Sequence, residues 1–235
     1  MRRLAGMSDS PVLVAAAHGT RDPAGRTVID RLRTGVADRR PGLDVAEAYV
    51  DEDVQQPGLT SVLAGLDEAV VVPVLLSAGY HVHVDVTDAV TAAGRPGVRA
   101  GRSLGPDPVL AEVLADRLAE SGVGDHAIVL AAAGSSDPRA ARDVEQMAEL
   151  LTARLGRLVT AAYATASRPA VSESVAALHA AGESVAIASY LLAPGSFHER
   201  LRTVGAEVVA APLLPDERIA ELVLRRYDEA LATAG

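Results

Sequence analysis

The sequence contains no cysteine, no tryptophan and no lysine among its 235 residues. Without cysteine, disulfides, thiolate metal sites and cysteine nucleophiles are excluded. Without lysine, a Schiff-base lysine and the lysine of a P-loop are excluded. No apolar run approaches the roughly 20 residues that span a bilayer, and the N-terminal segment lacks the apolar stretch of a secretory signal. We therefore expect a cytoplasmic protein with no membrane partner.

The charge balance is acidic, with 31 Asp and Glu residues against 22 basic residues and a net charge of −9. This excess, together with the lack of a basic block, argues against nucleic acid as a partner. Hydrophobic residues make up 49% of the chain, which is typical of a folded protein with a substantial core. At about 100–200 residues per domain, the length fits one large or two small domains.

Short apolar runs alternate with amphipathic stretches along the whole chain. Continuous apolar runs are typical of strands buried on both faces of a parallel sheet, and their alternation with helices indicates βαβ units. Strands are expected at 12–17, 44–50, 69–76, 97–101, 127–133, 158–164, 184–192 and 206–210. Helices are expected at 24–39, 57–66, 85–93, 107–121, 138–155, 169–181, 197–204 and 215–231.

The second half of the chain repeats the first. AHGTRDP at 17–23 aligns with AAGSSDP at 132–138, an offset of 115 (132 − 17), and LLSAG at 75–79 aligns with LLAPG at 191–195, an offset of 116 (191 − 75). We predict an α/β protein of two similar domains, each a mostly parallel sheet of about four strands flanked by helices, related by a pseudo-twofold axis with a cleft between them. The expected divisions are a tail at 1–10, a domain with the active site at 11–122 and a degenerate repeat at 123–235.

Candidate functional residues follow the expected strands of the first half. In open α/β sheets, ligands bind beyond the carboxyl ends of the strands. The first strand leads into His18, the second into Asp51, and the third into a loop with His81 and His83. Imidazoles and a carboxylate at one rim fit a borderline divalent metal such as Fe, Co, Ni or Zn. Neutral imidazole also accepts protons near neutral pH.

The duplication provides an internal control for these residues. Packing residues should recur in both halves, whereas the residues of a single active site need not. The positions equivalent to His18, Asp51 and His81 carry residues that neither bind a metal nor titrate: Ala133, Thr165 and Phe197. The one-sided set indicates one active site on a duplicated scaffold.

Two segments, LVAAAHGTRDPAG at 13–25 and VPVLLSAGYHVHVDV at 72–86, resemble the signature regions of the long, two-domain sirohydrochlorin chelatases. These class II tetrapyrrole chelatases include cobalt- and ferrochelatases of cobalamin and sirohaem biosynthesis. The resemblance extends over nearly the whole chain. It implies a chelatase-like fold and ATP-independent insertion of Fe²⁺, Co²⁺ or Ni²⁺ into sirohydrochlorin, with the metal as substrate and no tightly bound cofactor. It also implies that His18 and His81 bind the metal and accept pyrrole protons.

The chain departs from the family at two positions. The family often has Glu where this chain has Asp51, which we expect either as a further metal ligand or as a residue that orients an imidazole. His83 is an additional histidine, expected either as a further ligand or as a residue that faces solvent or the cleft without a required role. Sirohydrochlorin carries many carboxylates, which the free backbone amides and the polar side chains of two helix starts can bind. The expected substrate-binding residues are Gly19, Thr20, Arg21, Ser77, Gly79, Tyr80, Ser135 and Ser136.

Two other functions remain open at this stage. A non-catalytic carrier of metal or tetrapyrrole would use the same histidines. A phosphate- or nucleotide-binding module would cradle an anion at residues 18–21, but gives no reason for His81. The choice between cobalt and iron, and thus between cobalamin and sirohaem, also stays open, because cells select these metals by availability. Because the two halves are fused, we expect a monomer.

Overall fold

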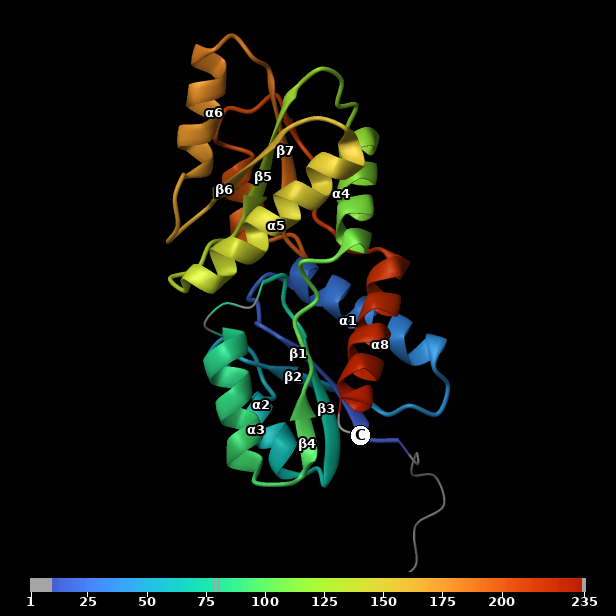
Figure 1. The fold of residues 1–235 in the computed structure, drawn as a ribbon. Helices are drawn as coiled ribbons and strands as arrows, with labels where there is room; N and C mark the ends of the chain where they lie inside the picture. Colours follow the sequence, from blue (N-terminus) through green and yellow to red (C-terminus); the bar gives the residue numbers. More distant parts are fainter. Residues whose placement is uncertain (1–9, 78, 80, 234–235) are drawn as a thin grey trace, which may run out of the picture.

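The structure is a computed structural model that describes residues 10–77, 79 and 81–233, with the side chains of 81–83 outside the description (Figure 1). It contains two four-stranded sheets in which all strand pairs are parallel. The first has the order β2-β1-β3-β4 and the second the order β6-β5-β7-β8. The predicted fold of two similar α/β domains is therefore confirmed.

The strands lie close to the predicted positions, and the apolar runs of the two central strands of each sheet are buried on both faces. They are β1 (Val12–Ala17), β2 (Val45–Tyr49), β3 (Glu68–Val74), β4 (Gly97–Ala100), β5 (Ala127–Ala132), β6 (Val159–Tyr163), β7 (Val185–Tyr190) and β8 (Val208–Val209). All six residues of β7 are buried, as are all but Glu68 in β3. The last strand is shorter than predicted, since only two residues of the apolar run at 206–210 pair with β7.

The helices are α1 (Pro23–Arg39), α2 (Leu59–Ala64), the π-helix η1 (His81–Val86), α3 (Thr87–Ala93), α4 (Pro108–Glu120), α5 (Pro138–Leu155), α6 (Val171–Ala180), α7 (Ser196–Leu201) and α8 (Glu217–Ala232). The helix predicted at 85–93 is thus preceded by a π-helix, a rare element that often occurs at functional sites. Within the described ranges, no helix is both long and apolar enough to cross a bilayer.

Each sheet is covered on both faces. Side chains of α2 and α3 pack on one face of the first sheet, and those of α6 and α7 on one face of the second. On the opposite faces, one continuous apolar cluster includes residues of both sheets and of α1, α4, α5 and α8. The two domains therefore share a core rather than folding around separate ones.

The last helix of each half-chain packs on the sheet of the other half. Helix α4 contacts α5 and β7, whereas α8 contacts α1 and β3 (Figure 1). This exchange of helices was not expected from the sequence. The division between residues 122 and 123 follows the sequence repeat and stays a prediction, because the packing joins each half-chain to the other.

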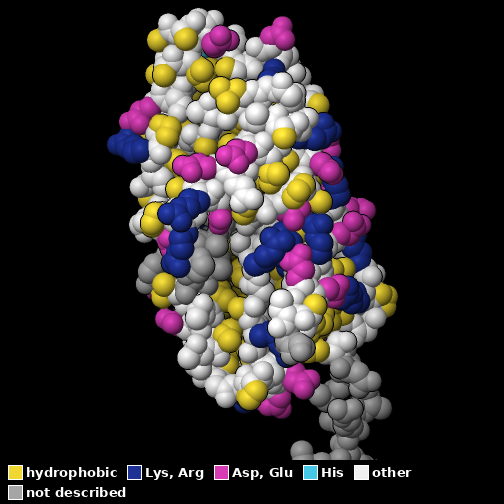
Figure 2. All heavy atoms as spheres, viewed as in Figure 1, with side chains coloured by type: hydrophobic (Ala, Val, Ile, Leu, Met, Phe, Trp, Pro, Cys, Tyr) yellow, Lys and Arg dark blue, Asp and Glu magenta, His cyan; other side chains and the backbone are white. Residues whose placement is uncertain are grey.

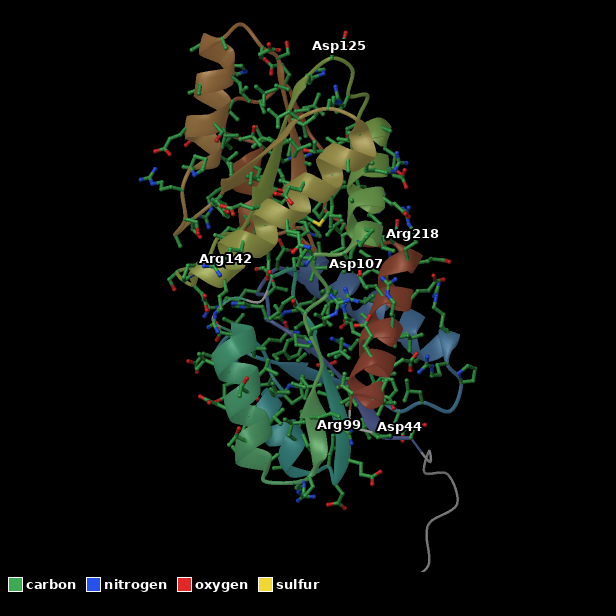
Figure 3. The ribbon with its side chains drawn as sticks, in the orientation of Figure 1. Asp44, Arg99, Asp107, Asp125, Arg142 and Arg218 are labelled. Carbon is green, nitrogen blue, oxygen red and sulfur yellow. The ribbon has the colours of Figure 1, made fainter. Side chains whose placement is uncertain are left out.

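Two arginines hold the segments that lead into the exchanged helices. In α8, Arg226 is fully buried and donates to the carbonyls of Ser103 and Leu104 (2.9 and 2.7 Å) and to Asp107 (2.7 Å). Asp107 lies where α4 and α8 meet, and it also caps α4 (Figure 3). In α4, Arg117 donates in the reverse direction, to carbonyls of the segment before α8. At both helix crossings, where α4 and α8 pass to the other domain, an arginine donates to backbone carbonyls. Only Arg226 also bonds the aspartate that caps the helix.

Candidate functional site

The chain beyond β1 and β2 stays paired for two further residues. The amide of Val50 donates to the carbonyl of Ala17 (2.9 Å), and the amide of Asp51 donates to the carbonyl of His18 (3.0 Å). His18 and Asp51 therefore occupy neighbouring backbone positions at the carboxyl edge of the first sheet. Both side chains are half-buried.

The turn after His18 requires glycine. Gly19 has a φ of +105°, a region that residues with a Cβ rarely adopt. A Cβ there would lie 3.3 Å from the carbonyl oxygen of Asp51. The glycine thus lets the chain turn into α1 while staying packed against the loop that carries Asp51.

The amides that follow this turn are already bonded. The Thr20 amide donates to the side chain of Gln55 (3.1 Å), and the Asp22 amide donates to the Thr20 hydroxyl (3.1 Å). Asp22 caps α1 by accepting from two amides of the first turn. The expectation of free amides is therefore wrong at these positions. The Thr20 hydroxyl proton and the exposed Arg21 side chain remain as candidate donors to a substrate carboxylate.

The second half has the same turn with different side chains. The Ser135 amide donates to the Ser167 hydroxyl (3.3 Å), which donates in turn to the Ser135 carbonyl (2.8 Å). The Asp137 amide donates to the Ser135 hydroxyl, as that of Asp22 does to Thr20. Ser136 is exposed. Binding of substrate by Ser135 and Ser136 stays a prediction.

The loop after β3 contacts the second domain. Gly79 is buried, and a Cβ on it would lie 3.0 Å from Ser135 Oγ and 3.4 Å from Ala140 Cβ, at the start of α5. The reciprocal contact is made by Gly25 of α1, where a Cβ would lie 2.9 Å from the Pro194 carbonyl oxygen. The carboxyl edges of the two sheets therefore face each other, and the predicted cleft belongs between them.

Several predicted residues lie outside the description. Tyr80 is outside it, and so are the side chains of His81 and His83, although the π-helix begins at His81. Ser77, just before these residues, is half-buried. Among the side chains that are described, no group of three or more His, Asp or Glu residues could hold a metal. A shared ion between His18 and His81 stays a prediction.

The backbone register matches the sequence alignment of the two halves. The amide of Thr165 donates to the carbonyl of Ala133 (2.9 Å), as that of Asp51 does to His18. Thr165 and Ala133 thus stand where the first half has Asp51 and His18. Phe197 follows the end of β7 at the interval that separates His81 from the end of β3 (197 − 190 and 81 − 74).

The aromatic ring at this position packs rather than binds. Phe197 contacts the apolar cluster beneath α6 and α7, and the guanidinium of Arg200 lies 4.9 Å from its ring centre. The next residue, His198, is 8% exposed and has its Nε2 3.3 Å from the Ala210 carbonyl oxygen. This part of the second half is therefore structural.

Arginine and acidic side chains lie together where the two domains meet (Figure 2). Figure 2 shows arginine side chains across the middle of this face, at the height where the domains join in Figure 1. Arg142, near the start of α5, is exposed and lies at this junction (Figure 3). No sequence motif marks Arg142, because one arginine on an amphipathic helix is usually solvated.

Sequence reasoning also missed two polar side chains that hold the site. Gln55 bonds the turn after His18, and Tyr190 of β7 donates to the Leu76 carbonyl in the other domain (2.7 Å). No local sequence pattern marks either side chain, because each contact joins residues far apart in the chain.

Two parallel sheets with the same strand order, exchanged helices and facing carboxyl edges define a two-domain chelatase-like α/β protein. The CbiX family profile matches residues 12–121 and again residues 127–230. Because these matches cover most of the chain, the chain belongs to the CbiX family, and the predicted resemblance is confirmed. A search of curated proteins gave no significant match.

Solved structures share the fold at low sequence identity. SirB from Bacillus subtilis with Fe³⁺ has a TM-score of 0.77 and 22% identity, over 94% of this chain and 95% of that one. The sirohydrochlorin chelatase SirB from Bacillus subtilis subspecies spizizenii, in complex with cobalt, has a TM-score of 0.72 and 18% identity, over 94% of each chain. CbiX, described as the terminal enzyme of sirohaem biosynthesis in denitrifying bacteria, has a TM-score of 0.66 and 18% identity, over 94% of this chain and 99% of that one.

Proposed function

We propose that this protein inserts a divalent metal ion, Co²⁺ or Fe²⁺, into sirohydrochlorin without ATP. One observation carries the proposal: equivalent backbone positions at the carboxyl edges hold His18 and Asp51 in one domain and Ala133 and Thr165 in the other. The fold does not need the imidazole or the carboxylate, since the second domain makes the same turn without them. Membership of the CbiX family and the metal-bound SirB structures support the same activity.

Insertion requires the metal to lose water and the macrocycle to lose its pyrrole N–H protons. In this proposal His18 and His81 hold the metal ion over the ring. As the ion passes to the ring nitrogens, the imidazole nitrogens that release it accept the two pyrrole protons. Asp51 either adds a carboxylate ligand or orients an imidazole, and His83 is a further ligand candidate. The metal is a substrate, so the site should bind it only transiently.

The substrate carboxylates need donors around this centre. We assign this binding to both facing edges: Thr20, Arg21, Ser77 and Gly79 with Tyr80 from the first domain, and Ser135 and Ser136 from the second. The second domain then acts as the opposing wall of the site. The proposal includes a monomeric, cytoplasmic enzyme of cobalamin or sirohaem biosynthesis that has no nucleic-acid or membrane partner.

A turnover assay separates this enzyme from a carrier, which would use the same residues. Sirohydrochlorin, Co²⁺ or Fe²⁺ and substoichiometric protein are mixed anaerobically, and the absorption change of the macrocycle is followed. Many equivalents of metallated product per protein support the chelatase, and rates should not change when ATP is added. One equivalent of product would instead support a carrier.

Two variants test the site. His18→Ala and His81→Ala should each reduce turnover by about 10³-fold, within the range for loss of a general base or ligand. His126→Ala, which changes a histidine near the N-terminus of β5, is the matched control and should keep wild-type rates. Normal turnover by either site variant would contradict the assignment of that residue.

A further inference from the structure

Tyr190 connects the second domain to the loop that leads to His81. It is the last residue of β7, it is 2% exposed, and its hydroxyl donates to the Leu76 carbonyl (2.7 Å). Leu76 lies between β3 and η1, five residues before His81 (81 − 76). Burial raises the pKa of Tyr190, so its hydroxyl keeps the proton that it donates.

The two halves differ at this position. In the second half, the equivalent carbonyl, that of Leu192, accepts from the backbone amide of Leu214 (2.9 Å). In the first half, Leu76 accepts from a side chain of the other domain instead. Val74, the residue equivalent to Tyr190, has no hydroxyl with which to make the reciprocal contact. The hydroxyl bond thus occurs only beside the loop with the histidines.

The close approach of Tyr190 depends on glycine at position 105. A Cβ on Gly105 would overlap both the Tyr190 hydroxyl oxygen and the Leu76 carbonyl oxygen. In the second half, the equivalent position is Leu214, which has a full side chain. The bond from Tyr190 to Leu76 therefore requires glycine at position 105.

The same loop also contacts the second domain further along. Gly79 packs on Ser135 and Ala140 at the start of α5. The second domain therefore contacts the segment between β3 and η1 at Leu76 and again at Gly79. Such contacts fix the start of η1, where His81 lies, relative to the domain interface.

We infer that Tyr190 is a positioning residue for metal insertion. Its hydroxyl holds the Leu76 carbonyl and thereby sets where the backbone of His81 begins η1 relative to His18. This inference rests on the proposed function. A misplaced catalytic group is costly, since a displacement of about 1 Å lowers rates by up to about 10²-fold.

The test compares Tyr190→Phe with Tyr227→Phe. Tyr227 is the matched control because it is 1% exposed and its hydroxyl donates to the Pro11 carbonyl (2.6 Å), at the start of β1, the end opposite the carboxyl edge. Both variants lose one buried hydroxyl bond and should lower Tm to a similar extent. Tyr190→Phe should in addition lower kcat about tenfold, in the range expected for a displaced group. Its KM for sirohydrochlorin should change less than kcat, by about twofold, because most of the proposed carboxylate donors lie outside the segment between β3 and η1.

A second readout needs no turnover. Titration of the metal-free protein with Co²⁺, followed by the absorption of the bound ion, should show weaker binding by Tyr190→Phe than by Tyr227→Phe. If one variant is less stable, both measurements are made equally far below each Tm. Equal kcat and equal Co²⁺ affinity in the two variants would overturn the inference, whereas a single equivalent of product from the wild-type protein would overturn the proposed function itself.

Discussion

The two domains share their backbone more closely than their side chains. Each sheet has the same strand order, each first helix is capped by an aspartate, and each carboxyl edge continues with the same pair of backbone bonds. At these equivalent positions, the first domain has His18 where the second has Ala133, and Asp51 where the second has Thr165. Because the turn forms with either set, its folding does not explain the histidine or the carboxylate. Where the two domains share the backbone but differ in the side chain, the fold does not account for the side chain. Such residues are therefore candidates for a role in function.

Among the paired substitutions, the largest difference in stability loss should be between the arginines that hold the segments before α4 and α8. Arg226→Met leaves Asp107 buried, although Arg225 still contacts it, and it removes donors from two carbonyls, so we expect a loss of about 3–5 kcal/mol. Arg117→Met removes weaker contacts from a side chain that is 16% exposed, with an expected loss of about 1–2 kcal/mol. Urea unfolding measures both, and equal losses would mean that the crossings are energetically equivalent.

The structure shows which features of the two domains could be predicted from the sequence and which could not. The strands were predictable because buried parallel strands need continuous apolar runs. The caps were predictable because an aspartate stands directly before the proline that begins both α1 and α5. The exchange of α4 and α8 was not predictable, because an amphipathic pattern does not specify which sheet its apolar face covers. Likewise, Tyr190 in an apolar strand looks like any core residue, since its partner Leu76 lies 114 residues away.

Substitution of the two turn glycines should give the next largest difference. Gly134→Ala places a Cβ that overlaps the Thr165 carbonyl at a φ of +94°, so the expected loss of stability is about 3 kcal/mol. Gly19 has a similar φ, but its added Cβ would lie 3.3 Å from the Asp51 carbonyl oxygen. For Gly19→Ala we therefore expect a smaller loss of stability, about 1–2 kcal/mol. Both free energies of unfolding are measured in urea. A larger loss at Gly19 would show that the first-half turn is the more tightly packed one.

Exchange of the polar residues that follow β2 and β6 tests chemistry rather than stability. Asp51→Asn keeps the size of the side chain but removes its charge, so kcat/KM for metal insertion should fall about tenfold, as for loss of a metal ligand's carboxylate partner. Thr165→Ala removes the hydroxyl bond to the Ala133 carbonyl and should cost about 1 kcal/mol of stability, with unchanged kcat/KM. A decrease in kcat/KM for Thr165→Ala alone would reverse the roles that we assign to the two domains.

The smallest expected effect concerns acid sensitivity at the β7–β8 edge of the second domain. The Val185 amide and then His179 hold the pKa of Glu207 at about 2, below its usual 4.5. A carboxyl whose pKa falls on folding stabilises the protein above pH 4.5, and this contribution is lost as the pH falls towards 2. Between pH 5 and pH 3, Glu207→Gln should therefore lose less stability in urea than the wild type. His179→Asn keeps the Val185 bond, the larger cause, and should retain most of the wild-type slope; if it abolishes the slope as fully as Glu207→Gln, the histidine rather than the strand amide sets the acid sensitivity of this edge.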